Sequence, residues 1–490
     1  MKGASADLSP CCEETCSPSG RATAGVPVNR YGGSFEDPDR LAAFLRTCGF
    51  SVSAAAAKAG LFARCAAALR ALDWAPPENG RAYFVPGRIE VLGKHTDYAG
   101  GSSLVAAAEQ GLCLIAVAAS DPWVRVADAI RGETIQFAMD SELVPPPGHW
   151  ANYPLTVARR LVRNFPGATR GARIALASDL PPAAGMSSSS ALLVAIAFAL
   201  ADANDIWSHE RFLPELNEPL KLAGYLATIE NGQSYGPLAG DRGVGTFGGS
   251  EDHTAILCAR PGFVRQYAYC PVRFQRQMPL PADWTFAMAS CGVAAEKTGS
   301  ALEKYNRASR LAAVVADLWR RETRGDAPHL AAAVRSQADA AERLRTILAG
   351  TEHGGEFRPR ELLDRLEHFL IENEQVIPAA GAALAGGDLE TFGRWVDRSQ
   401  RAAETLLGNQ IPETVYLAAA AREHGAAAAS AFGAGFGGSV WALVPTGRVA
   451  EFLAQWRRSY LDRFPQHEPQ AVFISTAAGP ALCRVNPAVA

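Results

Sequence analysis

Charged and polar side chains are unusually dense in residues 87–101, GRIEVLGKHTDYAGG. This one stretch contains Arg88, Lys94, His95 and Asp97. A guanidinium, an imidazole and a short carboxylate are groups that bind anions and hydroxyls, and packing alone does not require them at this spacing. The stretch therefore indicates a binding or catalytic site.

A run of four serines marks a second candidate site. The segment PPAAGMSSSSA follows a predicted strand at 174–177 and opens an apolar helix. The first N–H groups of a helix have no partner within the helix, and the helix dipole makes that end positive, so this turn suits a polyphosphate. The alternative is a helix cap, because serine is favoured there anyway, but a cap needs only one of the four.

Two other glycine-containing segments imitate nucleotide-binding motifs. GRIEVLGKHT has five residues between its glycines and His95 after its lysine, where a P-loop needs four residues and then Ser or Thr. GAGFGG at 433–438 matches GxGxxG, but we expect it to follow a helix and enter a strand, the reverse of a dinucleotide fingerprint. We reject the first interpretation and give the second little weight.

The composition describes an ordinary soluble protein with more than one domain. The chain has 490 residues, of which 48% are hydrophobic and 20% are charged, and this length exceeds a single compact core. Its 47 basic and 50 acidic side chains nearly cancel, so no field of one sign can gather nucleic acid or an anionic membrane. We expect small-molecule partners, and a monomer or homodimer.

The cysteines and the apolar runs predict a cytoplasmic protein. Ten cysteines are scattered without a regular framework, which is typical of reduced thiols. Cys11, Cys12 and Cys16 form the one cluster, and because no histidine accompanies them a zinc site is disfavoured. The longest apolar run, 191–201, is roughly half the length that a membrane span needs, and the N-terminus lacks a signal-like apolar core.

Hydrophobic spacing and turn residues predict a chain of mixed helices and strands. The predicted elements are disorder in 1–30, two helices within 37–72, strands near 81–87, 102–120, 134–139 and 284–290, a helix at 218–230, and mainly helices from about 298 to 424. We place a domain boundary near 270–285, which gives domains 31–275 and 276–490.

Three stretches, in this order, resemble the motifs of galactokinases, a branch of the GHMP small-molecule kinases. PGRIEVLGKHTDYAGG is similar to the first motif apart from Lys94, PPAAGMSSSSA to the second apart from Ala183, and GAGFGG to the third. The similarity covers about residues 30–480 and also includes IEN at Glu230, GGSEDH at Asp252 and EKYNRA at Tyr305.

The resemblance implies a fold and an activity. The fold would be α+β with two domains, an N-terminal ribosomal-protein-S5-like α/β domain and a C-terminal ferredoxin-like α+β domain, and the active site would lie in the cleft between them. The activity would be that of an ATP-dependent sugar 1-kinase, which phosphorylates the anomeric hydroxyl of galactose or a related aldose.

The same resemblance implies sites for ATP and Mg²⁺. The expected nucleotide-binding residues are Gly185, Met186, Ser187, Ser188, Ser189, Ser190 and Gly435. The Ser189 hydroxyl and the Glu230 carboxylate would hold Mg²⁺, which prefers oxygen ligands. Without the resemblance, Glu230 is more simply interpreted as the solvated end of a helix.

Catalysis is assigned by resemblance to Asp252 and Arg88. Asp252 would receive the proton of the anomeric hydroxyl, and Arg88 would pair with Asp252 and with the transferring group. Without the resemblance, the two would be interpreted as an ordinary surface ion pair. The residues expected to hold the sugar are Lys94, His95, Asp97, Gly249 and Tyr305.

Lys94 is the main departure from the galactokinase pattern. Galactokinases carry there a glutamate that contacts the far hydroxyl of the sugar, so the charge is inverted. An ammonium binds a carboxylate better than a hydroxyl, which makes a hexuronate 1-kinase one hypothesis. The alternative is that Lys94 pairs with Glu251 and that selectivity is unchanged.

The loop at 236–249 has two possible roles. The loop is longer than the motif requires and is either a lid or a surface feature. Nearby, His253 replaces the amide that usually follows the catalytic aspartate.

A non-catalytic, sugar-responsive binding protein is the competing hypothesis for the activity. The joint presence of Asp252, Arg88, Ser189 and Glu230 disfavours it, and HTDY disfavours mevalonate-like or homoserine-like substrates.

Overall fold

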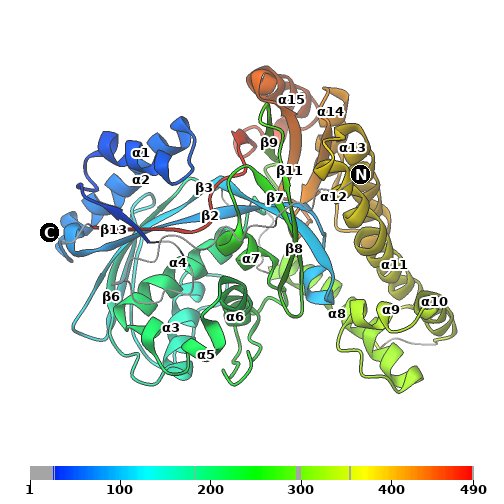
Figure 1. Ribbon diagram of the computed structural model, residues 1–490, viewed down its shortest axis with the longest axis horizontal. Helices are drawn as coiled ribbons and strands as arrows, with labels where there is room; N and C mark the ends of the chain where they lie inside the picture. The colour runs from blue at the N-terminus through cyan, green and yellow to red at the C-terminus, as the bar shows by residue number, and fades with distance from the viewer. Residues whose placement is uncertain (1–25, 27, 182–183, 294–298, 352–354, 488–490) are drawn as a thin grey trace, which may run out of the picture.

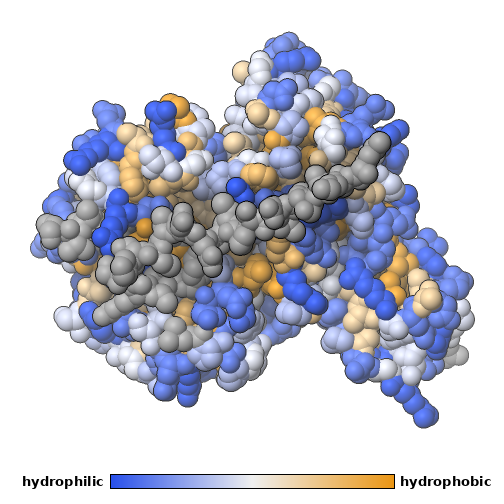
Figure 2. Space-filling model, viewed as in Figure 1, coloured by the Kyte–Doolittle hydropathy of each residue, from blue (hydrophilic) through white to orange (hydrophobic). Residues whose placement is uncertain are grey.

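The computed structural model describes residues 26, 28–181, 184–293, 299–351 and 355–487. The cysteine cluster at 11, 12 and 16, most of the segment 1–30 that we expected to be disordered, and Ala183 lie outside the described residues. Figure 1 shows two halves, each built on a sheet, with a helical arm extending from the second half. Figure 2 shows hydrophilic residues over the outer surfaces of both halves, with apolar residues between them.

The first sheet has nine strands and is mostly antiparallel. Its order is β1-β13-β2-β3-β6-β4-β5, with β7 paired to β3 and β8 paired to β7. The bounds are β1 Val28–Tyr31, β2 Arg81–Leu92, β3 Ser102–Ala118, β4 Trp123–Asp128, β5 Thr134–Ala138, β6 Ala172–Ser178, β7 Phe263–Ala268, β8 Arg273–Pro279 and β13 Cys483–Pro487.

Helices cover both faces of this sheet (Figure 1). One face carries α1 (Pro38–Thr47) and α2 (Val52–Ala71), and the other carries α3 (Asn152–Asn164), α4 (Ser188–Ala203), α5 (Leu213–Leu216), α6 (Pro219–Asn231) and α7 (Glu251–Cys258). Within the described residues, α2 is the one helix long and apolar enough to cross a membrane by composition. It buries Phe62 against the sheet and pairs buried Lys58 with Asp179, as a core helix does.

The second sheet has four antiparallel strands in the order β10-β11-β9-β12. They are β9 Trp284–Ser290, β10 Ala428–Phe432, β11 Ser439–Pro445 and β12 Val472–Thr476. The remaining helices are α8 Gly299–Thr323, α9 Leu330–Arg335, α10 Ala340–Gly350, α11 Pro359–Phe369, α12 Ile377–Ala385, α13 Leu389–Ala402, α14 Pro412–Glu423 and α15 Val449–Arg463. Short 3₁₀ turns are η1 Pro77–Asn79, η2 Asp97–Ala99, η3 Ile206–Ser208, η6 Thr446–Arg448 and η7 Pro465–His467, and π-helical segments are η4 Leu370–Val376 and η5 Ala403–Leu407.

The expected α+β fold and the two helices within 37–72 are confirmed. Two local expectations were wrong. β2 continues to Leu92, beyond the predicted strand end at residue 87, so the strand itself carries Arg88. β10 precedes GAGFGG, so this loop joins two antiparallel strands instead of following a helix. The alanine-rich segment before it is fully buried, and packing overrides its helix propensity.

The predicted domain boundary does not follow the sheets. A division at 275/276 cuts β8, and β13 at the end of the chain lies in the first sheet, between β1 and β2. The chain therefore returns to its first half after completing the second sheet. Composition along the chain does not predict that the last strand joins the first sheet.

Candidate active site

A pocket lies where the two halves of the molecule meet. Its empty space, open to solvent, is about 500 Å³. The first half contributes the end of β2, the turn at η2, the end of α6 and the start of α7, and the second half contributes α8 and the β10–β11 loop. The lining residues are Arg88, Glu90, His95, Asp97, Tyr98, Glu230, Asn231, Gly248, Gly249, Glu251, Asp252, His253, Tyr305, Gly433 and Ala434.

Arg88 and Asp252 form an ion pair in this pocket, although 164 positions separate them in the chain. Arg88 Nε and one terminal nitrogen each lie 2.6 Å from Asp252 Oδ1. The Arg88 N–H donates to the Met186 carbonyl (3.1 Å), and its guanidinium donates to the Gly185 carbonyl (3.3 Å). The arginine thus connects the aspartate to the serine-rich turn.

Two further carboxylates surround the same guanidinium. Glu251 Oε1 lies 3.4 Å from Arg88 Nε, and Glu90 Oε2 lies 4.0 Å from a terminal nitrogen of Arg88. Burial by itself lowers the pKa of Arg88, but the carboxylates of Asp252, Glu251 and Glu90 raise it by a larger amount. The pKa is therefore raised overall, and the guanidinium stays charged. The sequence analysis missed Glu90, although its spacing of two from Arg88 on a strand places both on one face.

The pKa of Glu251 is raised well above its ordinary value. Burial is the largest cause, the negative charges of Glu90, Asp97 and Asp252 add to it, and Arg88 opposes it. A folded state that holds a proton more tightly than the unfolded state loses stability as the pH rises above the ordinary glutamate pKa, about 4.3. The ionised Glu251 side chain is therefore destabilising at neutral and alkaline pH.

Replacing Glu251 by glutamine should stabilise the fold at alkaline pH. We expect Glu251→Gln to melt about 2–4 °C above the wild type at pH 8, with a difference that shrinks as the pH falls toward 4. Thermal melts across this pH range, with the exposed Glu142→Gln as control, measure the effect. A difference that stays constant with pH would contradict the assigned ionisation.

Lys94 does not line the pocket, contrary to its expected place beside the sugar. Its side chain is fully buried, and Nζ donates to Ser399 Oγ (3.0 Å) and Ser430 Oγ (2.7 Å) in the second half of the molecule. The alternative pairing of Lys94 with Glu251 was also wrong, because Glu251 faces Arg88. The side chain of residue 94 therefore joins the two halves of the protein.

His95 and Tyr305 form one wall of the pocket. His95 Nε2 lies 3.0 Å from the Ala434 carbonyl, and Nδ1 lies 2.7 Å from the Tyr98 hydroxyl. Because a carbonyl can only accept, Nε2 carries the proton that it donates to Ala434. The Tyr305 ring lies 5.4 Å from the His95 ring, centre to centre. The expected histidine and tyrosine are thus brought together.

Asp97 and Gly249 also meet in the pocket wall. Asp97 Oδ1 accepts from the Tyr98 N–H (2.8 Å), and Oδ2 accepts from the Glu251 N–H (3.2 Å). A Cβ at Gly249 would collide with Asp97 Oδ2 and approach the Tyr98 nitrogen. Glycine is therefore required here for the backbone to approach the carboxylate.

The serine-rich turn has the features of an anion-binding helix start. Gly185 and Ser187 adopt positive φ angles of 72° and 61°, and α4 begins at Ser188. The Ser187 hydroxyl is buried without a hydrogen-bond partner among the described residues. Ser188 is exposed and Ser189 is partly exposed, whereas the Met186 side chain is in the core. The free N–H groups and hydroxyls at this turn suit phosphate oxygens.

The glycine-rich β10–β11 loop lies against this turn. A Cβ at Gly433 would come within 3.0 Å of the Gly185 carbonyl. Gly433 and Ala434 line the pocket, but the expected Gly435 does not, because it packs against the Asn409 backbone. The sequence motif located the loop correctly but did not identify the residues that face the pocket.

The serine that reaches Glu230 is Ser190, one residue beyond the predicted Ser189. Ser190 Oγ donates to Glu230 Oε2 (2.8 Å) and lies 3.3 Å from Asp252 Oδ2. Thr246 Oγ1 lies 3.4 Å from Glu230 Oε1. Successive residues of a helix point about 100° apart, so the first helical residue decides which serine faces α6. The structure sets that start at Ser188.

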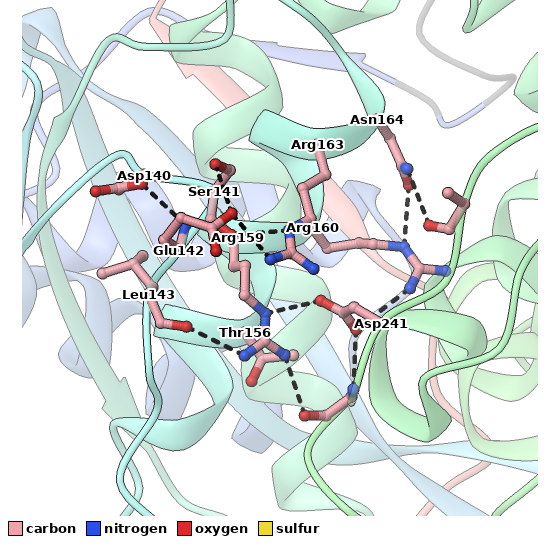
Figure 3. Close-up of polar contacts among 12 residues, drawn as sticks. Asp140, Ser141, Glu142, Leu143, Thr156, Arg159, Arg160, Arg163, Asn164 and Asp241 are labelled. Carbon is pink, nitrogen blue, oxygen red and sulfur yellow. Dashed lines mark hydrogen bonds and ion pairs between the residues drawn. The ribbon is translucent and has the colours of Figure 1, made fainter.

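The loop that follows α6 is anchored at Asp241 (Figure 3). Asp241 Oδ2 accepts from Arg159 Nε (2.7 Å), and Oδ1 lies 3.3 Å from Arg160. Arg160 also donates to Thr228 Oγ1 (3.1 Å) on α6, and Arg159 donates to the Gly243 carbonyl (3.3 Å). The three charged side chains are at most 4% exposed.

This anchor bears on the lid hypothesis for 236–249. Beyond Asp241, the Phe247 N–H donates to the Asn306 side chain on α8 (2.9 Å), and Asn231 donates to the Gly248 carbonyl (2.9 Å). The loop is thus held at its middle and again at the pocket. These hydrogen bonds attach the loop to α3, α6 and α8, so the loop forms part of the pocket wall.

Comparisons with known proteins agree with this geometry. Residues 152–237 match the GHMP kinases N terminal domain, residues 380–462 match the GHMP kinases C terminal domain, and residues 75–119 match the galactokinase galactose-binding signature. The chain belongs to the GHMP kinases. Its matched N-terminal segment includes the serine-rich turn, and the galactokinase signature includes Arg88 and Asp97.

Individual relatives place this GHMP kinase beside the galactokinases. It is 28% identical over 380 residues to a galactokinase of Roseiflexus sp. (strain RS-1), which covers 77% of this chain and 86% of the relative. It is 26% identical over 393 residues to a galactokinase of Enterococcus faecalis (79% and 91%). Lactococcus lactis galactokinase complexed with galactose has the same fold, with a TM-score of 0.68 and 23% identity over 85% of this chain and 98% of that one.

Proposed function

We propose that this GHMP kinase is an ATP-dependent sugar 1-kinase of the galactokinase type, which phosphorylates the anomeric hydroxyl of galactose or a closely related aldose. The observation that carries the proposal is the convergence of Arg88, Asp252, Ser190 and Glu230 beside the serine-rich turn. The galactose-binding signature at 75–119 supports the sugar as the acceptor. A cytoplasmic location remains part of the proposal.

The residues of the serine-rich turn fit a nucleoside triphosphate. The buried Ser187 hydroxyl lacks a partner among the described residues, and Gly185 is close to Gly433 with no side chain between the two loops. Phosphate oxygens would accept hydrogen bonds from these groups and from the first N–H groups of α4. ATP supplies the phosphoryl group, and this chain supplies the positively polarised cradle that orients it.

Glu230 and Ser190 fit a magnesium ion. Both offer oxygen atoms, which Mg²⁺ prefers, and proteins usually hold this ion by one or two carboxylates together with substrate phosphates and water. No three His, Cys, Asp or Glu side chains converge as a metal site in the described part of the chain. A small donor set of this kind suits an ion that arrives with the nucleotide. Bound there, Mg²⁺ would neutralise phosphate charge.

Asp252 and Arg88 would carry out the acceptor side of the reaction. Asp252 accepts the proton of the anomeric hydroxyl as that oxygen bonds to phosphorus. Arg88 holds the carboxylate in place and offers positive charge to the transferring group, which matters more than a strong base when the transition state is loose. His95, Asp97, Gly249 and Tyr305 would hold the sugar on the other walls of the pocket.

A turnover assay with a sugar panel tests the proposal. ADP release is measured with Mg-ATP and galactose, other aldoses, galacturonate or glucuronate. We expect galactose or a neutral relative to be turned over at least tenfold faster than either uronate. Wild-type protein that binds galactose but releases no ADP would instead support the non-catalytic, sugar-responsive binding protein.

The hexuronate alternative has lost the observation that motivated it. Lys94 donates to two serines outside the pocket, so no ammonium from residue 94 faces the substrate. Five of the lining residues are carboxylic acids, namely Glu90, Asp97, Glu230, Glu251 and Asp252. A substrate carboxylate would carry the same charge as these side chains when they are ionised, so repulsion would disfavour its binding in this pocket.

Ser190, rather than Ser189, should be the serine that supports the metal. We expect Ser190→Ala to raise the Mg²⁺ concentration for half-maximal activity by about tenfold, since a hydrogen bond to a charged group contributes about 1.5–3 kcal/mol. Ser189→Ala serves as the matched control, and we expect it to change this value less than threefold. Activity against Mg²⁺ concentration at fixed ATP measures both, and the reverse order would assign the metal to Ser189 instead.

A further inference from the structure

Glu90 is a carboxylate in the pocket wall to which the proposed reaction assigns no task. It lies on β2, two residues after Arg88, and its side chain is 5% exposed. Glu90 Oε2 accepts from the Gly433 N–H (3.3 Å) and lies 4.0 Å from Arg88. One oxygen of Glu90 is therefore held in place by the β10–β11 loop.

The other oxygen of Glu90 is unsatisfied. Oε1 is buried and has no hydrogen-bond partner among the described residues. A buried acceptor without a donor is unfavourable, and the cost is larger for a charged group. Burial raises the pKa of Glu90, and the positive charges of Arg88 and Lys94 oppose this rise. Lys94 nevertheless directs its ammonium to Ser399 and Ser430 rather than to Oε1. The protein itself thus leaves Oε1 available to a ligand.

A sugar hydroxyl is the donor that fits this place. The pocket is lined by Glu90 together with Gly433 and Ala434 on the loop that His95 also contacts. A hydroxyl can donate to a carboxylate oxygen, whereas a deoxygenated carbon cannot, and a carboxylate substituent would be repelled. A site built to bind a hydroxyl discriminates strongly against an analogue that lacks it.

We propose that Glu90 is a specificity-determining residue whose Oε1 accepts a hydrogen bond from one hydroxyl of the sugar. This inference rests on the proposed sugar-kinase function and adds an acceptor that the family resemblance did not assign. Glu90 thus supplies an acidic group to this wall from β2, just before the turn that carries Lys94.

Glu90→Gln is the discriminating variant. Glutamine keeps the shape and one oxygen for the Gly433 N–H but replaces the free oxygen with an amide donor. The matched control is Glu109→Gln, which alters a buried glutamate of β3 that is bonded to Ser51 rather than placed in the pocket. Thermal melts establish that both variants are folded, and Glu90→Asp provides a second, smaller change if Glu90→Gln is not.

The experiment measures sugar affinity by calorimetry for galactose and for its 2-, 3-, 4- and 6-deoxy analogues. We expect Glu90→Gln to weaken galactose binding by about 10- to 150-fold, the range for a hydrogen bond to a charged group. We also expect the wild type to lose affinity for one deoxy analogue, and Glu90→Gln to cause no additional loss with that analogue. Glu109→Gln should leave all five affinities within threefold.

The outcomes separate this inference from the proposed function. An unchanged affinity for galactose in Glu90→Gln, or an equal loss with all five sugars, would overturn the role of Glu90. Wild-type protein that binds none of the five sugars would overturn it as well. The ADP-release assay is run in parallel, so the expected affinity pattern without turnover would uphold Glu90 as a reader of the sugar and reject catalysis.

Discussion

Asp252→Asn is expected to lower kcat for sugar phosphorylation by about 10²- to 10⁴-fold, the range for loss of a general base. Asparagine has nearly the same shape as aspartate but cannot take a proton and carries no charge to orient Arg88. Arg88 would keep the Glu251 side chain at 3.4 Å, so the pocket should remain assembled. The rate of ADP release at saturating sugar and Mg-ATP measures the effect.

Two controls make the Asp252 result specific. Asp326→Asn changes an exposed aspartate and should leave kcat unchanged. Sugar affinity of Asp252→Asn, measured without nucleotide, should change far less than kcat, because the predicted role lies in proton transfer. A kcat within threefold of the wild type would reject Asp252 as the base, and an equal loss of affinity and rate would reassign it to sugar binding.

Asp241→Asn is expected to lower the free energy of unfolding by about 3–5 kcal/mol, the range for removing one partner of a buried ion pair. Arg159 and Arg160 would both keep a buried positive charge without its carboxylate. The loop they hold carries Gly248 and Gly249 to the pocket. Urea unfolding followed by far-UV circular dichroism measures the loss.

The same helix offers a matched control, visible in Figure 3. Arg163 pairs with Glu142 at 3.2 Å, but the Glu142 side chain is 78% exposed. Exposed pairs contribute about 0–1 kcal/mol, so Glu142→Gln should have little effect. If Asp241→Asn proves no more destabilising than Glu142→Gln, the three charges are not the anchor of this loop.

Local sequence was sufficient for the chemical groups and for most elements of the fold. The opening pair of helices and the strands follow from hydrophobic spacing, which depends on residues close together in the chain. The α+β class followed from the resemblance to the galactokinases. The motifs likewise located Arg88, Asp252 and the serine-rich turn, which the structure brings within hydrogen-bonding distance of one another. Only the resemblance across three motifs predicted that these segments share one site. No single motif contains information about its distance from the other two.

Side-chain directions within the motifs could not be predicted in the same way. Lys94 occupies a motif position yet leaves the pocket, because serines on α13 and β10 accept its hydrogen bonds. Ser190 rather than Ser189 meets Glu230, because the start of α4 sets the rotation of the helix. In both cases the deciding partner is distant in the chain.

The sequence alone therefore determined which reactive side chains this protein contains and which segments of the chain carry them. Only the tertiary structure decided which of them face the pocket, as it did for Glu90, Gly433 and the loop anchored at Asp241. The physical reason is that residue types and local periodicity are properties of neighbouring residues, whereas burial, ion pairing and hydrogen bonding depend on contacts between segments far apart in the chain.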